Sequence, residues 1–416
     1  MCESLQCEIQ SKFRDEMFTK RTASSHETYV DEINNTRNSK TKHYKGVKNQ
    51  NCLAPLEFYH VIDGLPPDLM HDFQEGNMMK VFTLLILKLQ DLGLYSIAKL
   101  NVDLKTFKYN RNDARNKIPF NIFLESTKQL KLSASHAHTL CTIFPIIIGN
   151  RFDGTPGQQY YEHFLSLIEI FRKLCDDSYD NFKLFDLADK IEIFIKEFKI
   201  LFPVVPLTYK MHVMVHYPRA IRMFGPPLTY STIRWDSKHS FLKRIHHANH
   251  NHVNLNSSIA KRHQILMLYH SLTSKYFLDH EFGSVHKVNT QIKDLVSCLL
   301  HTNDLQFFNF ISYNRVTYTV GDVVIIKRKT QRNLPLFASI NTIVYQSSLE
   351  SFYLLIENLI TLDYKPNFTG YNVTQHNDSI QKLIKIEELA HYSPINSYLV
   401  TDQNSRSTVV VPKFCI

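Results

Sequence analysis

The spacing of apolar residues changes near residue 310, and this change restricts the chain to a fold with a helical part and a sheet part. Before residue 310, apolar residues recur every three or four positions, which predicts helices. After it, short β-branched runs alternate with polar turns, which predicts strands. The expected helices begin at Pro66-Pro67-Asp68 and include 84–94, 134–148, 160–174 and 186–202. The expected strands are 318–326 (with a Gly-Asp turn inside it), 338–345, 352–356, 371–374 and 408–411.

These patterns predict an α+β fold with four segments. Residues 1–63 form a polar N-terminal segment, and 64–275 form a mainly α-helical region. Residues 276–309 are expected to be a helical linker. Residues 310–416 are expected to form a small β-rich domain that resembles a barrel of SH3-like or BAH-like type.

Composition excludes several classes of protein. The chain has 416 residues, 44% of them hydrophobic and 21% charged, as in globular proteins. It has neither the roughly 18 consecutive apolar residues of a membrane helix nor a secretory signal at Met1, so we expect no membrane partner. Seven scattered cysteines, an odd number, favour a reducing compartment. The net charge of +9 is compatible with nucleic acid as a partner, and equally with an ordinary basic enzyme.

Two histidines and an acid lie close together in the middle of the sequence. His212 and His216 are four residues apart, so on a helix both imidazoles point to one face, as in many zinc sites. Asp236 follows after a turn, between Arg234 and Lys238. On spacing alone, the ordinary interpretation is a packed histidine pair held by hydrogen bonds, and an acid that pairs with a surface cation.

Three motifs, in this order, resemble the CACTA (EnSpm-like) DNA transposases of the CMC superfamily, in their animal form. The first resembles the family's Pro-x-Asp-x-Met-His-Asp-x-x-Glu-Gly and runs from Gly64 to Gly76. The second covers His212 to Pro218, Phe224-Gly225-Pro226 and Ile233 to His239, and resembles His-(x)3-His-Tyr-Pro, Phe-Gly-Pro-Leu and Met-Arg-Phe-Glu-Ala-Lys-His. The third, Ile259 to Gln264, is similar to Leu-Ala-x-Arg-His-Gln. The resemblance implies the C-terminal portion of an RNase H-like transposase with a helical insertion.

The same resemblance implies a structural zinc site. In the family, and in the related catalytic subunit of the V(D)J recombinase, such a histidine pair forms half of a Zn²⁺ site, and an upstream Cys-x-x-Cys completes it. This sequence departs from the pattern, since Cys2 and Cys7 have four residues between them. We therefore expect His212, His216, Cys2 and Cys7 to be the ligands if zinc binds.

By resemblance, Asp236 takes the place of the third acid of a DDE triad, where the family usually has Glu. Such triads hold two divalent ions that activate water, and Mg²⁺ suits their oxygen ligands. The family's first two acids lie upstream of the cysteine pair, so the chain as given is expected to lack them. We expect Mg²⁺ to be a cofactor only if the chain is catalytically active. Asp68, His71 and Glu75 belong to the first motif. We expect Asp68 to cap the following helix, and His71 to contact either the active site or DNA.

A basic run follows Asp236. Arg234, Lys238, His239, Lys243 and Arg244 provide side chains that suit phosphate contacts, and further histidines extend the run to His252. The alternative is an exposed polar helix and loop with no nucleic-acid role.

Three functions are compatible with these observations. The leading hypothesis is a domesticated or truncated transposon-derived protein, nuclear, DNA-binding and catalytically inactive. The second is an active DDE-type transposase that cuts DNA with two metal ions, and the third is a helical module for protein interactions. A homo-oligomer is compatible with each.

Overall fold

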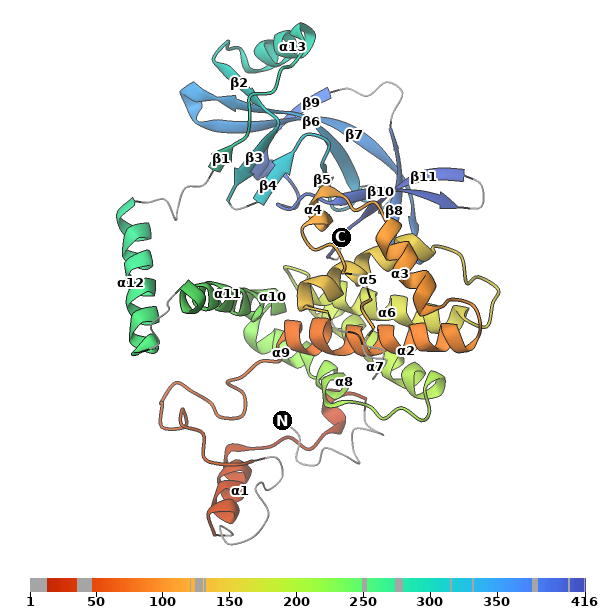
Figure 1. The fold of residues 1–416 in the computed structure, drawn as a ribbon, viewed down its shortest axis with the longest axis vertical. Coiled ribbons are helices and arrows are strands. Elements are labelled where there is room, and N and C mark those ends of the chain that lie inside the picture. Colours follow the sequence, from red (N-terminus) through yellow and green to blue (C-terminus); the bar gives the residue numbers. More distant parts are fainter. Residues whose placement is uncertain are drawn as a thin grey trace.

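The computed structural model describes residues 13–35, 47–119, 121–123, 130, 132–248, 253–273, 280–314, 316–330, 333–375, 381–402, 405–414 and 416. Helices dominate the first two thirds and strands the last third, so the α+β prediction is confirmed at that level (Figure 1). The described helices and turns before the sheet are η2 (Asp15–Met17), α1 (Ala23–Asn35), η3 (Met70–Asn77), α2 (Met78–Asp91), α3 (Ile97–Thr106), α4 (Arg111–Ala114), α5 (Ala134–Ile148), α6 (Gln158–Leu174), α7 (Asn181–Leu201), α8 (Tyr209–Met214), α9 (Tyr217–Phe224), α10 (Pro227–Tyr230), α11 (Ile233–Ala248) and α12 (Leu255–Thr273).

Several of these helices begin where a side chain satisfies a free backbone N–H. Ser133 caps α5 by accepting the N–H of His136, and Asp180 caps α7 by accepting that of Lys183. Thr208 caps α8 in the same way. The predicted helix 134–148 coincides with α5, because its cap and its apolar run are both visible in the sequence.

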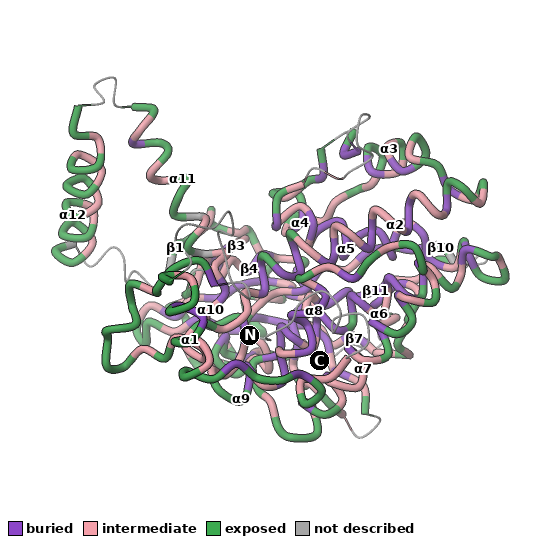
Figure 2. The backbone as a smooth tube through the Cα atoms, turned by 90° about the horizontal axis from the view of Figure 1, so that it is seen from below, coloured by how far each residue is buried: buried purple, intermediate pink, exposed green. Residues whose placement is uncertain are grey.

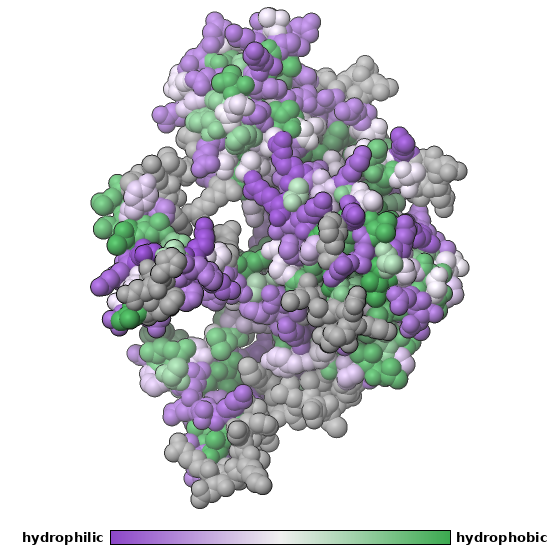
Figure 3. Space-filling view, in the orientation of Figure 1, coloured by the Kyte–Doolittle hydropathy of each residue, from purple (hydrophilic) through white to green (hydrophobic). Residues whose placement is uncertain are grey.

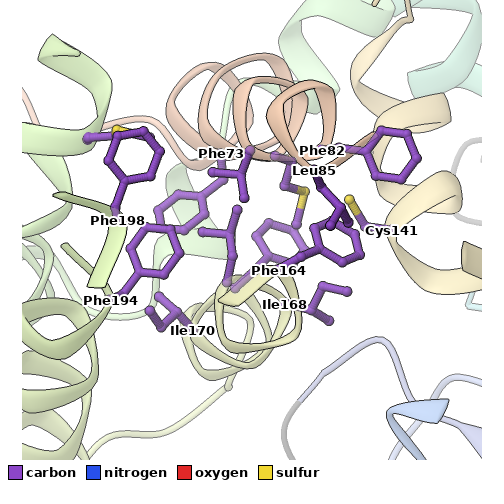
Figure 4. Packing of buried hydrophobic residues seen from close by; sticks show 14 of the residues in the cluster. Phe73, Phe82, Leu85, Cys141, Phe164, Ile168, Ile170, Phe194 and Phe198 are labelled. Carbon is purple, nitrogen blue, oxygen red and sulfur yellow. The ribbon is translucent and has the colours of Figure 1, made fainter. Parts of the chain in front are cut away.

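The helical core is built around phenylalanines. Phe73, Phe82 and Phe164 are fully buried (Figure 4). Phe144 is also fully buried, and its ring meets that of Phe82 edge to face with centroids 4.8 Å apart. Helices α2, α6 and α7 all contribute to this core. The first motif packs on it, since Leu69 and Phe73 are part of the core and η3 contacts α2 and α5.

The strands form one large antiparallel sheet and one small sheet. The large sheet has the order β10-β11-β8-β7-β6-β2, with β5 beside β6 and β9 beside β7; β1, β3 and β4 form the small sheet. The long strand β7 pairs with β9 along its first half and with β8 along its second, and bulges interrupt the β6–β7 and β7–β8 ladders. The bounds are β1 (His280–Phe282), β2 (Leu305–Phe308), β3 (Phe310–Tyr313), β4 (Val316–Thr319), β5 (Val323–Lys327), β6 (Leu336–Gln346), β7 (Ser351–Lys365), β8 (Gly370–Gln375), β9 (Gln381–Lys385), β10 (Asn396–Asp402) and β11 (Ser405–Val411), with short turns η5 (Ser347–Leu349), η6 (Pro366–Phe368) and η7 (Ile386–Glu388).

The described strands do not close into a ring, so the barrel-like detail of the prediction is not confirmed. The segment predicted as a helical linker contains α13 (Thr290–Leu300), but it also contains β1 and β2, which pair with later strands. Val296 of α13 packs in one cluster with Val344 and Leu355 of the large sheet. The segment therefore belongs structurally with the sheet.

The sheet lies against the helical part through a buried seam. Asp113 of α4 is fully buried and accepts hydrogen bonds from Asn396, Tyr398 and Lys413, the last at 2.5 Å. Nearby, Arg172 donates to the carbonyl of Thr369 at 2.6 Å.

One glycine is required at this seam. Gly149 ends α5 with φ of +54°, and a Cβ there would lie 2.8 Å from the ring of Phe368. The seam is thus held by buried polar contacts and by close packing at once.

Candidate functional site

A cleft of about 520 Å³ separates the N-terminal segment from α8 and α9. Acids, bases and aromatic rings line it together, and both predicted histidines are among them. Its described lining consists of Asp15, Phe18, Lys20, Arg21, Ile62, Asp63, Leu65, Pro66, Pro67, Asp68, Asp72, Tyr209, His212, Val213, His216, Arg219, Ala220, Met223 and Phe224.

The histidine pair forms one wall of this cleft. His212 lies on α8 and His216 lies just before α9, so the two side chains come from successive short helices and not from one continuous helix. Their Nε2 atoms still lie 3.1 Å apart, with the rings nearly perpendicular. A tetrahedral zinc ion with Zn–N bonds of about 2.0–2.1 Å separates two such nitrogens by about 3.3 Å. The same distance also fits one N–H···N hydrogen bond.

The N-terminal segment reaches the pair through Asp15 and Phe18. Asp15 Oδ1 lies 2.7 Å from His216 Nδ1, and Phe18 lies edge-on to His212 with ring centroids 4.6 Å apart. Burial acts to raise the pKa of Asp15, but His216 and Lys20 outweigh it and hold that pKa below its usual value. A carboxylate on Nδ1 fixes the orientation of an imidazole and directs its Nε2 outward, an arrangement common behind metal-bound histidines.

The remaining predicted zinc ligands, Cys2 and Cys7, lie outside the described residues. Within the part of the chain that the structure describes, no group of three or more His, Cys, Asp or Glu side chains is placed to hold a metal ion. His212 and His216 thus have the geometry of half a site.

A second constellation joins the first motif to α11. Asp68 accepts the backbone N–H of His71 at 3.1 Å, so the predicted capping contact is present. The same carboxylate lies 2.5 Å from His71 Nδ1, and it accepts hydrogen bonds from Thr232 N and Oγ1. On the other side of the ring, His71 Nε2 lies 3.7 Å from Asp236 Oδ2. His71 therefore bridges Asp68 and Asp236.

The environment of Asp68 keeps it ionised. Burial acts to raise its pKa, but hydrogen bonds from Thr232 and His71 outweigh burial, and the pKa lies below its usual value. Its Oδ2 faces Nδ1 of His71, and Nε2 of the same ring faces Asp236.

The third carboxylate, Asp72, lies deeper in the cleft. It is 9% exposed, and Tyr217 donates a hydrogen bond to its Oδ2 at 3.1 Å. Burial raises its pKa to about 6. Glu75 of the same motif is exposed and is not part of the cleft lining described above.

These motif residues lie on an uncommon helix. Residues Met70–Asn77 form a π-helix, whose hydrogen bonds span five residues, and such turns occur often at functional sites. Gly76 allows it to approach α8 closely, since a Cβ there would lie 2.5 Å from the side chain of Lys210.

Helix α11 carries the predicted DNA-binding residues. Lys238, His239, Lys243 and Arg244 are all exposed, whereas the side chain of Arg234 lies outside the described part. Asp236 is half-exposed, and besides His71 its Oδ1 has Nδ1 of His239 as a neighbour, at 4.0 Å. Over the described residues of α11, α12 and their flanks, 233–248 and 253–273, six Lys and Arg residues accompany one acid, Asp236.

A second cavity, of about 240 Å³, lies at the seam between helices and sheet. Its main charged groups are already paired: Arg328 with Asp176 and Asp177, and Lys413 with Asp113. It is a weaker candidate than the cleft for that reason.

Two residues of the candidate site could not be found from the sequence. Asp15 and Thr232 carry no motif, and they meet their partners across 201 and 164 residues of chain. The one sequence signal close to Thr232 is the Ile-Arg-Trp-Asp run, which begins at the next residue.

No family model, curated protein or solved structure matches this chain. None of the described helices is long and apolar enough to cross a membrane.

Proposed function

We propose that this chain is a transposon-derived DNA-binding protein that contacts the phosphate backbone through α11. The observation that carries the proposal is the charge of helices α11 and α12 with their flanks, which have six cations and one acid over the described residues 233–248 and 253–273. Lys238, Lys243 and Arg244 are exposed, and exposed cations on one helix suit contact with a polyanion.

The motifs extend this proposal to a CACTA-like transposase that is incomplete and catalytically inactive, a remnant of an RNase H-like enzyme that acts in the nucleus. The side chains within ion-pair distance of Asp236 among the described residues are those of His71 and His239, and not those of further carboxylates. A pair of catalytic metal ions needs several carboxylates. In this proposal His212 and His216 bind Zn²⁺ as part of a structural site, and Mg²⁺ has a role only if cleavage activity survives.

The test is the salt dependence of DNA binding. Each phosphate contact contributes about 0.9 to the slope of log K against log salt concentration. If Lys238, Lys243 and Arg244 each contact a phosphate, replacing all three with alanine flattens the slope by about 2.7. The measurement is fluorescence anisotropy with a labelled duplex of mixed sequence over a series of salt concentrations.

A matched control removes three exposed lysines elsewhere. Lys287, Lys293 and Lys382 lie in the sheet-rich part, and their alanine variant loses the same net charge. The proposal predicts a flatter slope for the α11 variant alone. Equal slopes for the two variants, or no salt-dependent retention of the wild type, would overturn it.

A further inference from the structure

Helix α11 carries the only tryptophan of the chain, and it is exposed. The side chain of Trp235 is 72% exposed, although tryptophan side chains are on average highly buried in folded proteins. Helices α11 and α12 extend away from the main body, and much of α11 faces solvent (Figure 2). The indole ring is therefore accessible to a partner molecule.

Cations lie beside this ring. Lys238 follows Trp235 by three residues, so the two side chains are neighbours on the surface of the helix. Lys243 follows Trp235 by eight residues, a rise of about 12 Å along the helix. Both lysines are exposed, and hydrophilic side chains gather over α11 at the left of the molecule (Figure 3). A partner that offers negative charge next to a flat apolar surface would complement this arrangement.

The acid of α11 is directed elsewhere. Asp236 is the one acid among the described residues of this helix, and it lies about 100° around the helix from Trp235. Its carboxylate faces His71 of the first motif, with Oδ2 3.7 Å from the imidazole Nε2. The acid therefore does not lie between the indole and the two lysines.

The surroundings of the ring favour one kind of partner. A membrane surface or an apolar protein interface requires a broad apolar face. The other large apolar side chains described on α11 are half-buried or buried, and these are Ile233, Phe241, Leu242 and Ile245. The indole is thus a single flat surface among cations. A nucleic-acid base requires only such a surface, and its phosphates supply the negative charge.

We propose that Trp235 stacks on an unpaired base of DNA while Lys238 and Lys243 contact the flanking phosphates. This inference rests on the DNA binding proposed above and specifies the form of DNA that α11 prefers. Within a paired duplex each base is already stacked on its neighbours, and exposing one costs free energy. That cost is smallest where a base is unpaired, so the indole gains most there.

The test compares two labelled duplexes of the same sequence, one fully paired and one with a single unpaired adenine. Stacking on an aromatic side chain contributes enough that Trp235→Ala should weaken binding to the bulged duplex by about 5- to 150-fold more than binding to the paired duplex. Affinity is measured by fluorescence anisotropy of the label. In the wild type, tryptophan emission comes from Trp235 alone, and the bulged duplex should quench it more strongly than the paired one.

Two further variants serve as controls. Trp235→Phe keeps an aromatic ring and should keep a preference for the bulged duplex. Phe182→Ala removes an aromatic side chain of α7 that is 80% exposed, and it should bind both duplexes as the wild type does. Equal losses of Trp235→Ala on the two duplexes, or equal quenching by them, would overturn this inference and leave phosphate binding by α11 intact. Absence of salt-dependent binding to either duplex would overturn both proposals.

Discussion

Asp72 should make the protein less stable as the pH rises through the range between 4 and 6. Its carboxyl group lies in the cleft, 9% exposed, and burial raises its pKa from 3.8 to about 6. Between these values the native state holds a proton that the unfolded chain has already released. The free energy of unfolding therefore falls as the pH rises through this window, and above it the full penalty is present.

The magnitude follows from the two pKa values. One pKa unit corresponds to about 1.36 kcal/mol, so the difference between a pKa of 3.8 and one of about 6 lowers the free energy of unfolding by about 3 kcal/mol. Asp72→Asn removes the charge and keeps an oxygen that can accept the hydrogen bond of Tyr217. We therefore expect this variant to be more stable than the wild type by up to about 3 kcal/mol near pH 7.5, with the difference approaching zero near pH 4.

The assay is urea unfolding at several pH values, followed by far-ultraviolet circular dichroism. The single tryptophan, Trp235, is 72% exposed on α11, so its fluorescence would report poorly on the core. Asp91→Asn, at the exposed end of α2, removes one carboxylate elsewhere and should follow the wild type. A stability difference for Asp72→Asn that does not change with pH, or a variant less stable than the wild type near neutral pH, would refute the reasoning.

Three further predictions concern the metal sites and the sheet. By elemental analysis, the purified wild type should contain close to one equivalent of zinc, and the variant with His212 and His216 replaced by alanine should contain none. If neither protein contains zinc and both have the same melting temperature, the two residues are ordinary hydrogen-bonded histidines. Supercoiled plasmid should stay intact with Mg²⁺ or Mn²⁺, and nicking that disappears in Asp236→Asn would show an active nuclease instead. A fragment of residues 280–416, which adds β1 and α13 to the predicted unit, should give a β-rich spectrum and a cooperative thermal transition; a helical spectrum or a gradual change would contradict it.

Local signals in the sequence were sufficient for the long apolar helices α2, α5, α6 and α7 and for strands β4 to β8 and β11. Helix α5 was predicted within its observed limits, because a serine cap and an unbroken apolar run define it. The turn between β4 and β5 was likewise visible as Gly321-Asp322. Strands β2 and β10 were not predicted. β2 is recognisable chiefly through its pairing with β6, which comes later in the chain, whereas β10 pairs with β11, the next strand in sequence.

The candidate site was predictable only in part. The four-residue spacing of His212 and His216 does bring their Nε2 atoms together, although the helix ends between them. The π-helix at Met70–Asn77 was not predicted, because its spacing of apolar residues is that expected of an α-helix and its composition does not distinguish the two helix types. Thr232 and Asp15 enter through tertiary contacts, which single-sequence periodicity does not encode.

The seam between helices and sheet has a consequence for the order of events during synthesis. Asp113 is fully buried, and its lysine partner, Lys413, follows 300 residues later. At about 5–20 residues per second, the ribosome takes roughly 15–60 s to make that interval. Throughout this time Asp113 lacks the cation of Lys413, and burying a carboxylate without a compensating cation is costly. The nascent helical part should therefore keep α4 open until the final strands emerge, so that closing the seam is a late step in folding.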